Sequence, residues 1–471
     1  MSVTPLDPTS TRDLAPGNAL VIGAGASGRA AAALLLALGH HVRVYDRDPA
    51  AAVPPGAAPF LGAPEPPAAA FADLHLLVLS PGVPPGPALA ARDRHAPGAR
   101  VEGEMSLSLA VAAQRWGRVP DVRITGTNGK STVTALTGAL LAAGGLRPFV
   151  GGNLGVPLAE ALRAQLAGAG PAPDSLVLEC SSFQLERPAA IPPAVAMVLN
   201  LTPDHLDRYP TLTDYAATKA NIFRGLAPDG LALLDGRDPW TPFFRARVPA
   251  GRIVLVDGTG PEGQVPEDSI ARIHGPGAGH TLELPGGETY PRAALGLAGR
   301  HNSKNALFAL LAARHLGVAP EACLAGLRGF VGLPHRMVHV RDLDDVAYYD
   351  DSKATNVASV LANLDGFDRR FVLIAGGRPK GDDLAPLRAL LARQGRALVA
   401  IGESAEQFFA VGDGVVPSAR ATSMAAAVAA ARELARPGDA VVLSPACASY
   451  DWFKNYGERG DVFAACVRAL A

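Results

Sequence analysis

The sequence predicts an α/β protein of three domains with mainly parallel sheets. The chain has 471 residues, which corresponds to about three domains at 100–200 residues each. Short apolar runs alternate with helix-like segments along the chain, as in βαβ units. The strands form three groups, so we expect an N-terminal domain over 1–108, a central domain over 109–332 and a C-terminal α/β domain over 333–471.

The first group of strands indicates a small doubly wound, Rossmann-like domain. "ALVIGAGASG" reads as a strand that enters a glycine turn, and "RAAAALLLALG" as a helix that ends at Gly39. "HVRVYD" and "LHLLVLSPG" read as further strands. Parallel strands joined by a crossover helix give the doubly wound arrangement.

The glycine turn of this domain is a candidate diphosphate site. Gly23, Gly25 and Gly28 have the G-x-G-x-x-G spacing, and Asp46 ends the next strand. This pattern is typical of dinucleotide-binding loops, in which the helix N-terminus faces a pyrophosphate. The alternative is that the glycines serve only to pack the helix on the strand.

The central domain begins with a variant phosphate loop. In "ITGTNGKST" the usual Walker A spacing would require glycine at position 124, which is Ile124. Gly126 and Gly129 still allow close backbone approach, Lys130 is suited to terminal phosphates, and Ser131 is suited to Mg²⁺. A plain strand–turn–helix corner is the alternative. We interpret the segment as a central P-loop-type ATPase domain with a helix over 131–143.

Two further strands of this domain end in candidate metal ligands. "SLVLEC" brings Glu179 to a carboxyl end, and "AVAMVLN" is followed by Asp204 and His205. Ligands of α/β sheets bind at this edge, and Mg²⁺ takes few protein ligands beside phosphate oxygens. Neutral histidine is a less usual Mg²⁺ ligand, so the spacing leaves the role of His205 open.

Lysine is scarce in this chain. The arginine-rich sequence has only six lysines, so those that persist mark positions where a compact or reactive amine is needed. Lys219 lies within a predicted helix, with no acidic residue three or four positions away. A solvated surface lysine is the alternative. The six are Lys130, Lys219, Lys304, Lys353, Lys380 and Lys454.

The C-terminal group of strands carries polar loops at the expected ligand-binding edge. The loops are "YYDDSKATN", "GGRPKGDD" and "SPACASYDWFKNYGERG", and each follows a predicted strand. One such loop has no special meaning, but three at one sheet edge indicate an active-site face.

Bulk composition excludes several classes of protein. The net charge is −1 and 48% of residues are hydrophobic, which is unlike nucleic-acid-binding or membrane-surface proteins. No apolar stretch is long enough to span a membrane, and the N-terminus lacks a signal-peptide pattern. The four cysteines have neither zinc nor disulfide spacing. We expect a reduced, cytoplasmic enzyme that acts as a monomer.

Together these stretches resemble the Mur ligases, the ATP-dependent amide ligases of bacterial cell-wall precursor synthesis. "GTNGKST" is similar to the phosphate loop of that family, which holds ATP. "GGNLGVP", "DDSKATN", "GLPHR" and "SPACASYDWFKNYGERG" are similar to its D-glutamate-adding branch. The resemblance implies UDP-N-acetylmuramoyl-L-alanine and D-glutamate as substrates, and ATP with two Mg²⁺ ions as cofactors.

The resemblance also implies roles for individual residues. The uridine-diphosphate substrate would contact Gly25, Ser27, Asp46, Arg47, Ser80 and Asn153. ATP would contact Gly126, Thr127, Asn128, Gly129, Lys130, Ser131, Thr132, Asn302, Asn305, His335, Arg336, Asp351 and Lys353. D-Glutamate would contact Thr355, Lys380, Ser449, Tyr450 and Tyr456. The metal ions would be bound by Ser131, Glu179, His205 and Lys219.

In this family the lysine that matches Lys219 is carbamylated by CO₂, which turns an ammonium into a metal-binding anion. The resemblance makes Lys130, His205, Lys219, Arg336, Asp351 and Lys353 the catalytic set. His205 and Asp351 both remain candidates to take the amine proton. Lys304 and Lys454 receive no role.

The chain departs from the family pattern at a few positions. Arg378–Pro379 replaces a small or acidic pair, and Tyr450 and Tyr456 replace an aliphatic residue and Phe. An L-alanine-adding or folylpolyglutamate-type ligase on the same scaffold is an alternative, although the latter normally lacks the N-terminal domain. A non-catalytic nucleotide-binding module is an alternative from another class.

Overall fold

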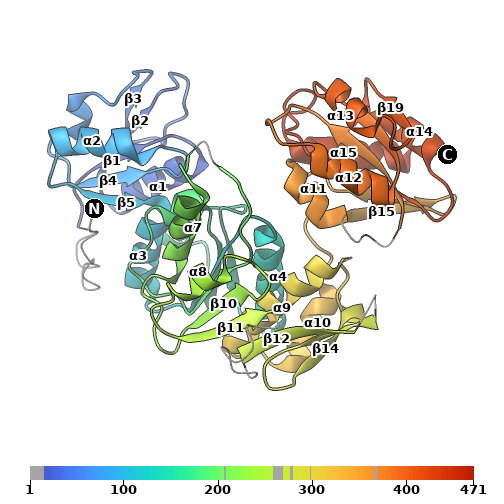
Figure 1. Cartoon of the computed structure of the whole chain (residues 1–471). Coiled ribbons are helices and arrows are strands. Elements are labelled where there is room, and N and C mark those ends of the chain that lie inside the picture. Colours follow the sequence, from blue (N-terminus) through green and yellow to red (C-terminus); the bar gives the residue numbers. More distant parts are fainter. Residues whose placement is uncertain are drawn as a thin grey trace. The chain divides into compact units, whose positions relative to one another are not determined.

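The computed structural model describes residues 15–205, 208–257, 269–275, 279–297, 299–364, 367 and 369–471. These residues form three sheets of five, nine and six strands with helices around them (Figure 1). Most neighbouring strands are parallel, so the predicted α/β class is confirmed. Among the described residues no helix is long and apolar enough to cross a membrane.

The chain packs into two compact units. The first extends to Ala294 and includes Asn305–Gly329, and the second contains Leu295–Lys304 and Phe330–Ala471. The first and second sheets therefore belong to one unit, and the third sheet belongs to the other. The three expected domain limits stay a prediction.

The first sheet has the strand order β3-β2-β1-β4-β5, and every pair is parallel. Alternate residues of β1 face opposite sides, so Ala19 and Val21 belong to one hydrophobic core while Leu20 and Ile22 belong to another. The strands are β1 (Asn18–Ile22), β2 (His41–Asp46), β3 (Ala58–Leu61), β4 (Leu76–Leu79) and β5 (Arg100–Gly103). The helices are α1 (Ala26–Ala37), η2 (Ala68–Phe71), α2 (Pro85–His95) and α3 (Glu104–Trp116).

The first core continues without a break into the second sheet. It contains residues of α1 and α3 together with Leu158 and Leu162 of α5 (Leu158–Leu166). At the same contact the Glu104 carboxylate accepts a hydrogen bond from the Ala159 N–H at 3.2 Å. The first two sheets therefore share one hydrophobic core.

The second sheet has the order β14-β13-β12-β11-β10-β9-β6-β8-β7. It is parallel from β7 to β12, and only β13 and β14 are antiparallel. The strands are β6 (Asp121–Thr125), β7 (Pro148–Gly152), β8 (Ser175–Glu179), β9 (Val195–Val198), β10 (Leu231–Asp235), β11 (Arg252–Val256), β12 (Ile270–His274), β13 (Thr281–Glu283) and β14 (Thr289–Pro291). Its other helices are α4 (Lys130–Ala143), α6 (Ser182–Leu185), α7 (Leu212–Ala220), η3 (Asn221–Phe223), α8 (Thr241–Arg245), η6 (Arg292–Ala294), α9 (Arg300–His315) and α10 (Pro320–Gly329).

The stretch 250–300 is rich in glycine and proline, and only part of it is a hairpin. Its first strand, β11, pairs in parallel with β10 and extends the main sheet. Hydrophobic side chains of β11 fill the core beside β10, since Val254, Leu255 and Val256 are buried. The hairpin begins only at β12.

The third sheet has the order β15-β16-β20-β17-β18-β19, with β15 antiparallel to β16. Two buried clusters, one on each face, form its core. The strands are β15 (Val338–Leu343), β16 (Val346–Asp350), β17 (Phe371–Gly376), β18 (Gly395–Ile401), β19 (Ser418–Arg420) and β20 (Ala440–Leu443). The helices are α11 (Val357–Leu364), α12 (Ala385–Gln394), α13 (Ala405–Gly412), α14 (Met424–Leu434) and α15 (Tyr456–Arg468).

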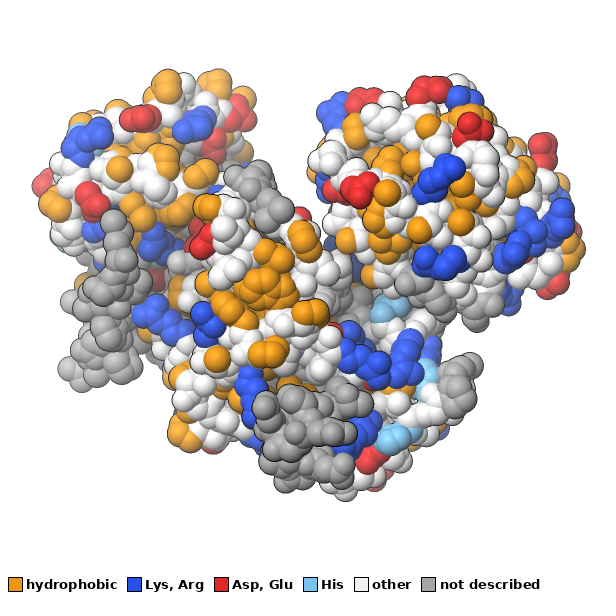
Figure 2. Space-filling view, in the orientation of Figure 1, with side chains coloured by type: hydrophobic (Ala, Val, Ile, Leu, Met, Phe, Trp, Pro, Cys, Tyr) orange, Lys and Arg blue, Asp and Glu red, His pale blue; other side chains and the backbone are white. Residues whose placement is uncertain are grey.

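The distribution of charged side chains on the surface and the state of the cysteines can be compared with the composition. On the face that Figure 2 shows, basic side chains lie in small groups among neutral, apolar and acidic surface, without a broad single-sign area. All four cysteines are unpaired, as their spacing predicts.

The glycine turn of the first sheet gives a direct test of packing. A Cβ added at Gly28 would lie 1.8 Å from the Gly23 carbonyl oxygen, whereas one at Gly25 would meet no atom within 4 Å. We expect Gly28→Ala to lower the free energy of unfolding by at least about 2 kcal/mol, because helix and strand must move apart. Gly25→Ala is the matched control. Equal melting temperatures for the two variants in a thermal denaturation experiment would contradict this packing.

Candidate active site

The phosphate loop lies between β6 and α4 and depends on two glycines with positive φ. Gly126 has φ of 148° and approaches Leu199, while Gly129 has φ of 84° and adjoins Asn305. A side chain at Gly129 would lie 2.8 Å from Asn305 Oδ1. The loop therefore brings its backbone close to its neighbours, as a phosphate-binding loop requires.

Lys130 and the start of α4 give the loop its positive character. The Lys130 Nζ donates to the carbonyl oxygens of Gly126 and Thr127, at 2.9 Å each. Ser131 and Thr132 are buried in the first turn of α4. The first N–H groups of a helix and its dipole favour an anion at this position.

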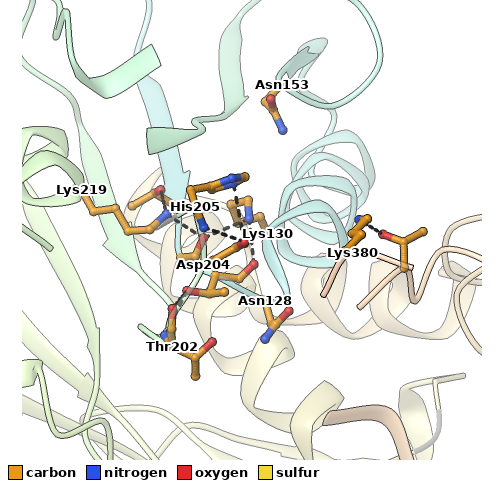
Figure 3. Close-up of polar contacts among 12 residues, drawn as sticks. Asn128, Lys130, Asn153, Thr202, Asp204, His205, Lys219 and Lys380 are labelled. Atoms are coloured by element: carbon orange, nitrogen blue, oxygen red, sulfur yellow. Dashed lines mark hydrogen bonds and ion pairs between the residues drawn. The ribbon is translucent and has the colours of Figure 1, made fainter. Parts of the chain in front are cut away.

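Lys219 is buried beneath the same loop. Only 1% of its surface is exposed, so the alternative of a solvated lysine is wrong. Its Nζ donates to the Gly126 carbonyl at 2.9 Å and to Thr125 Oγ1 at 3.3 Å, and it lies 4.6 Å from the centre of the Tyr215 ring. Figure 3 shows Lys219, Lys130, Asp204 and His205 gathered at the loop.

Burial changes the acid–base behaviour of Lys219. Desolvation and then the nearby charge of Lys130 lower the pKa of Lys219 well below its ordinary value. Both effects act against the ammonium form. The site therefore favours a neutral amine, which is the form that reacts with electrophiles.

Glu179 presents its carboxyl group at the end of β8. It is 3% exposed, and its Oε1 accepts a hydrogen bond from Asn153 Nδ2 at 2.6 Å. Its Oε2 is buried and has no hydrogen-bond partner. A buried carboxylate oxygen in this state is costly, and a cation bound there would compensate it.

Asp204 and His205 follow β9 on the neighbouring loop. His205 has φ of 55°, and its N–H donates to Asp204 Oδ1 at 2.9 Å. Its ring lies 4.8 Å from the Phe183 ring, and its side chain is 42% exposed. The described residues contain no group of three or more His, Cys, Asp or Glu side chains that could hold a metal ion.

The first sheet carries a cavity of about 240 Å³ at the predicted diphosphate turn. It is lined by Gly23, Asp46 and Arg47 among others. The Asp46 carboxylate accepts hydrogen bonds from the N–H groups of Ala24 at 2.6 Å and Asp48 at 2.9 Å. Asp46 thus fixes the turn at whose end Gly25 caps α1, with Ser27 in its first turn.

Ser80 lies beside this turn without lining the cavity. It is 8% exposed, and a Cβ added at Gly23 would lie 2.8 Å from the Ser80 Cβ. Ser80 therefore lies at the glycine turn but is not among the residues that line the cavity, and its contact with substrate stays a prediction.

In the second unit, three of the predicted D-glutamate residues take part in two side-chain pairs, one of them with the predicted ATP residue Lys353. Lys380 Nζ donates to Thr355 Oγ1 at 3.1 Å, and Lys353 Nζ donates to Tyr456 Oη at 3.2 Å. The second pair uses the hydroxyl by which Tyr456 departs from the family pattern. Ser449 is buried and Tyr450 is 64% exposed.

Other predicted ATP residues have different surroundings. His335 Nδ1 lies 2.7 Å from Asp350 Oδ2. Asn302 and Asn305 are both buried in α9, but Asn302 belongs to the second unit and Asn305 to the first. Asn305 thus belongs to the same unit as the phosphate loop, where it lies beside Gly129.

Asp351 is directed into the third sheet. It is 1% exposed, and its Oδ2 accepts from Ser444 Oγ at 2.6 Å and from Asn363 Nδ2 at 2.8 Å. Its Oδ1 accepts from the Met337 N–H at 3.3 Å. These contacts hold the carboxyl group within the third sheet, and its expected approach to ATP stays a prediction.

Sequence reasoning missed two side chains that organise these loops. Arg459 is 1% exposed and donates to the Ser352 backbone and hydroxyl oxygens and to the Cys447 carbonyl. It thereby joins the loops that carry Lys353 and Ser449. Asn200 contacts the phosphate loop. Arginine is abundant in this chain, so the residue type alone gave no signal for Arg459. Its place in the "YGERG" stretch was the one feature that set it apart from the other arginines.

Comparison with known proteins identifies the family. The Mur ligase middle domain matches residues 124–313, and the "Mur ligase, glutamate ligase domain" matches residues 335–447. The UDP-N-acetylmuramoylalanine–D-glutamate ligase of Thiobacillus denitrificans is 42% identical over 96% of both chains. The chain belongs to the Mur ligase family. The resemblance inferred from the motifs and the expected enzyme class, a ligase, are confirmed.

Further relatives and solved structures agree with this assignment. The Chromobacterium violaceum protein of the same name is 42% identical, over 97% of this chain and 99% of its own. The structure of UDP-N-acetylmuramate-alanine ligase from Thermotoga maritima has a TM-score of 0.56 at 15% identity, covering 96% of this chain and 99% of its own. Mycobacterium tuberculosis folylpolyglutamate synthase, complexed with ADP and AMPPCP, has a TM-score of 0.55 at 20% identity, covering 76% and 94%. Identities of 15% and 20% establish a common fold, so this chain and both solved structures share the Mur ligase fold.

The buried carboxyl group of Asp351 predicts a pH-dependent stability. Desolvation raises the pKa of Asp351 to about 7, so the folded protein holds a proton that the unfolded chain releases near pH 4. Stability from this group is complete below about pH 4 and is lost as the pH rises through about 7, by at most about 4 kcal/mol. We expect Asp351→Asn, which stays neutral, to reduce this loss.

The measurement is denaturant unfolding of the wild type and of Asp351→Asn between about pH 5 and about pH 8. Asp439→Asn is a control, because its carboxylate is paired with Arg396 at 2.7 Å. Parallel stability curves for wild type and Asp351→Asn would show that the carboxyl group is ionised throughout.

Proposed function

We propose that this chain is an ATP-dependent amide ligase that joins D-glutamate to UDP-N-acetylmuramoyl-L-alanine in cytoplasmic peptidoglycan precursor synthesis. The observation that carries the proposal is the 42% identity over nearly the whole chain with relatives named for this reaction. The matching length includes the loops around Lys353, Lys380 and Ser449, on which the choice of amino acid depends.

The proposal assigns one substrate to each group of residues. The cavity beside Asp46 and Arg47 would take the uridine diphosphate end, since its turn and the N-terminus of α1 suit a diphosphate. The phosphate loop would take the ATP phosphates. The Lys380–Thr355 pair and Ser449 would hold the carboxylates of D-glutamate.

The residues at the loop fit Mg²⁺. The unpartnered Oε2 of Glu179 supports one ion together with Ser131, and His205 with a modified Lys219 would hold a second. When bound, such ions neutralise charge on phosphate and carboxylate oxygens. The orphan carboxylate oxygen is the feature that supports the first assignment.

Lys219 would carry the second metal as a carbamate. The neutral amine attacks the carbon of CO₂, the new N–C bond forms, and one proton leaves to solvent. The surroundings that lower the pKa of Lys219 favour the reactive amine. An arginine keeps its charge and does not undergo this reaction.

The reaction then follows from the need for a leaving group. The substrate carboxylate attacks the γ-phosphorus, ADP departs, and an acyl phosphate forms. The D-glutamate amine attacks the acyl carbon, loses a proton, and expels phosphate. Lys130 and Arg336 would stabilise the negative charge that develops in both steps. Asp351 is buried, so its geometry argues against its taking this proton. His205, which is 42% exposed, would take it only when its imidazole lone pair does not bind a metal ion.

Amino-acid selectivity tests the proposed function. With UDP-N-acetylmuramoyl-L-alanine and MgATP, we expect phosphate release to require D-glutamate and to be at background with L-glutamate, L-alanine or meso-diaminopimelate. The D-isomer is selected because Lys380, Thr355 and Ser449 fix both carboxylates. Comparable turnover with L-alanine would instead support the L-alanine-adding alternative, and ATP binding without turnover would support a nucleotide-binding module.

Substitution of Lys219 tests the carbamate. We expect Lys219→Arg and Lys219→Ala to remain folded and to lose at least about a hundredfold in kcat/KM. Acetate should partly restore Lys219→Ala, because its carboxylate replaces the missing anion. Lys454→Arg, at an exposed lysine without an assigned role, is the control. A Lys219→Arg enzyme with near-normal activity in CO₂-depleted buffer would rule out the carbamate.

A further inference from the structure

We propose that Asn200 is a positioning residue that holds the phosphate loop in its nucleotide-binding form. It is the first residue of the "NLTPDHLDRYP" stretch, in which the proposed function gives a role only to His205. This inference rests on the proposed function only in taking the ligand of the loop to be a nucleoside polyphosphate.

The Asn200 side chain contacts three backbone groups of the loop. Its Oδ1 accepts hydrogen bonds from the N–H of Thr127 at 3.1 Å and from that of Asn128 at 2.8 Å. Its Nδ2 donates to the Asn128 carbonyl at 3.0 Å. One amide side chain thus contacts three successive peptide units, from Gly126–Thr127 to Asn128–Gly129.

A second set of contacts joins the same two segments. The Thr127 hydroxyl donates to the Thr202 carbonyl at 3.1 Å and accepts from the Thr202 N–H at 3.0 Å. The Asn200 carbonyl also accepts from the Thr127 N–H, at 3.1 Å. The loop is therefore paired with residues 200–202 although more than seventy residues separate them, and Figure 3 shows Thr202 against the loop.

These bonds decide which way the peptide units of the loop point. The carbonyl oxygens of Gly126 and Thr127 accept from Lys130, and that of Asn128 accepts from Asn200. With the N–H groups of Thr127 and Asn128 taken by Asn200, the turn at Gly129 and the start of α4 are left to face an anion. Carbonyl oxygens directed at side-chain donors do not repel phosphate.

The loop needs such support because of its composition. Gly126 and Gly129 adopt positive φ, and glycine gains the most conformational freedom when unrestrained. Ordering a mobile loop on binding would subtract from the affinity for nucleotide. Asn200 fixes the loop beforehand, so its effect is specific to the nucleotide and does not extend to the other substrates.

The test is calorimetric titration of MgADP into wild-type protein, Asn200→Ala and Asn200→Asp, with steady-state kinetics on the same samples. We expect Asn200→Ala to weaken MgADP binding and raise the KM for MgATP by at least about tenfold, since three hydrogen bonds to the loop are lost. The KM values for UDP-N-acetylmuramoyl-L-alanine and D-glutamate should not change. Amide hydrogen exchange of the peptide that contains Thr127 and Asn128 should become faster.

Asn200→Asp keeps both acceptor bonds and the size of the side chain but loses the donor to the Asn128 carbonyl. It should weaken MgADP binding measurably. If Asn200→Ala does not fold, Asn200→Asp serves as the test of the inference. Asn18→Ala, which removes a side-chain bond of 3.1 Å to the Asp73 carbonyl in the first sheet, is the control. Unchanged MgADP affinity and loop exchange in a folded Asn200 variant would overturn the inference, whereas no MgADP binding by the wild type would overturn the proposed function instead.

Discussion

The phosphate loop at the carboxyl edge of the second sheet is the constraint on which the rest of the site depends. Three adjacent parallel strands, β8, β6 and β9, end there, so Glu179, the loop and the Asn200–His205 segment meet at one place. The positive φ of Gly126 and Gly129 lets the backbone pass between Leu199 and Asn305. Any movement of the loop would disturb the candidate metal ligands and both lysines together.

Two amines share one carbonyl oxygen at this loop. Lys130 and Lys219 both donate to Gly126 O at 2.9 Å, and two like charges this close, one of them buried, are unfavourable. The repulsion is relieved when one amine loses its proton. Lys219 is the one that does so, because it is more buried than Lys130. Burial therefore divides the work: Lys130 keeps the charge that phosphate needs, and Lys219 becomes an amine suited to covalent modification.

The strand pattern and the motif chemistry were predictable because they are local. The loop, the helix after Lys130 and the buried strands follow from periodicity and glycine spacing. The scarcity of lysine drew attention to Lys219, which is buried, while its role stays a prediction. The sequence did not reveal the direction in which individual side chains point. Asp351 lies in a polar motif, yet Ser444 and Asn363 hold it inward, and those partners are distant in sequence. The same holds for Arg459 and Asn200, whose contacts depend on loops that only the fold brings together. It also holds for β11, which extends the parallel sheet within a stretch rich in glycine and proline.

The central claim is that ATP at this loop activates a carboxylate, and transfer of labelled oxygen tests it most directly. UDP-N-acetylmuramoyl-L-alanine with ¹⁸O in its terminal carboxylate would be turned over with MgATP and D-glutamate, and the released phosphate analysed by mass spectrometry. An acyl phosphate requires that one ¹⁸O atom pass from the carboxylate to each phosphate released. Phosphate without the label, formed alongside the amide product, would contradict the account.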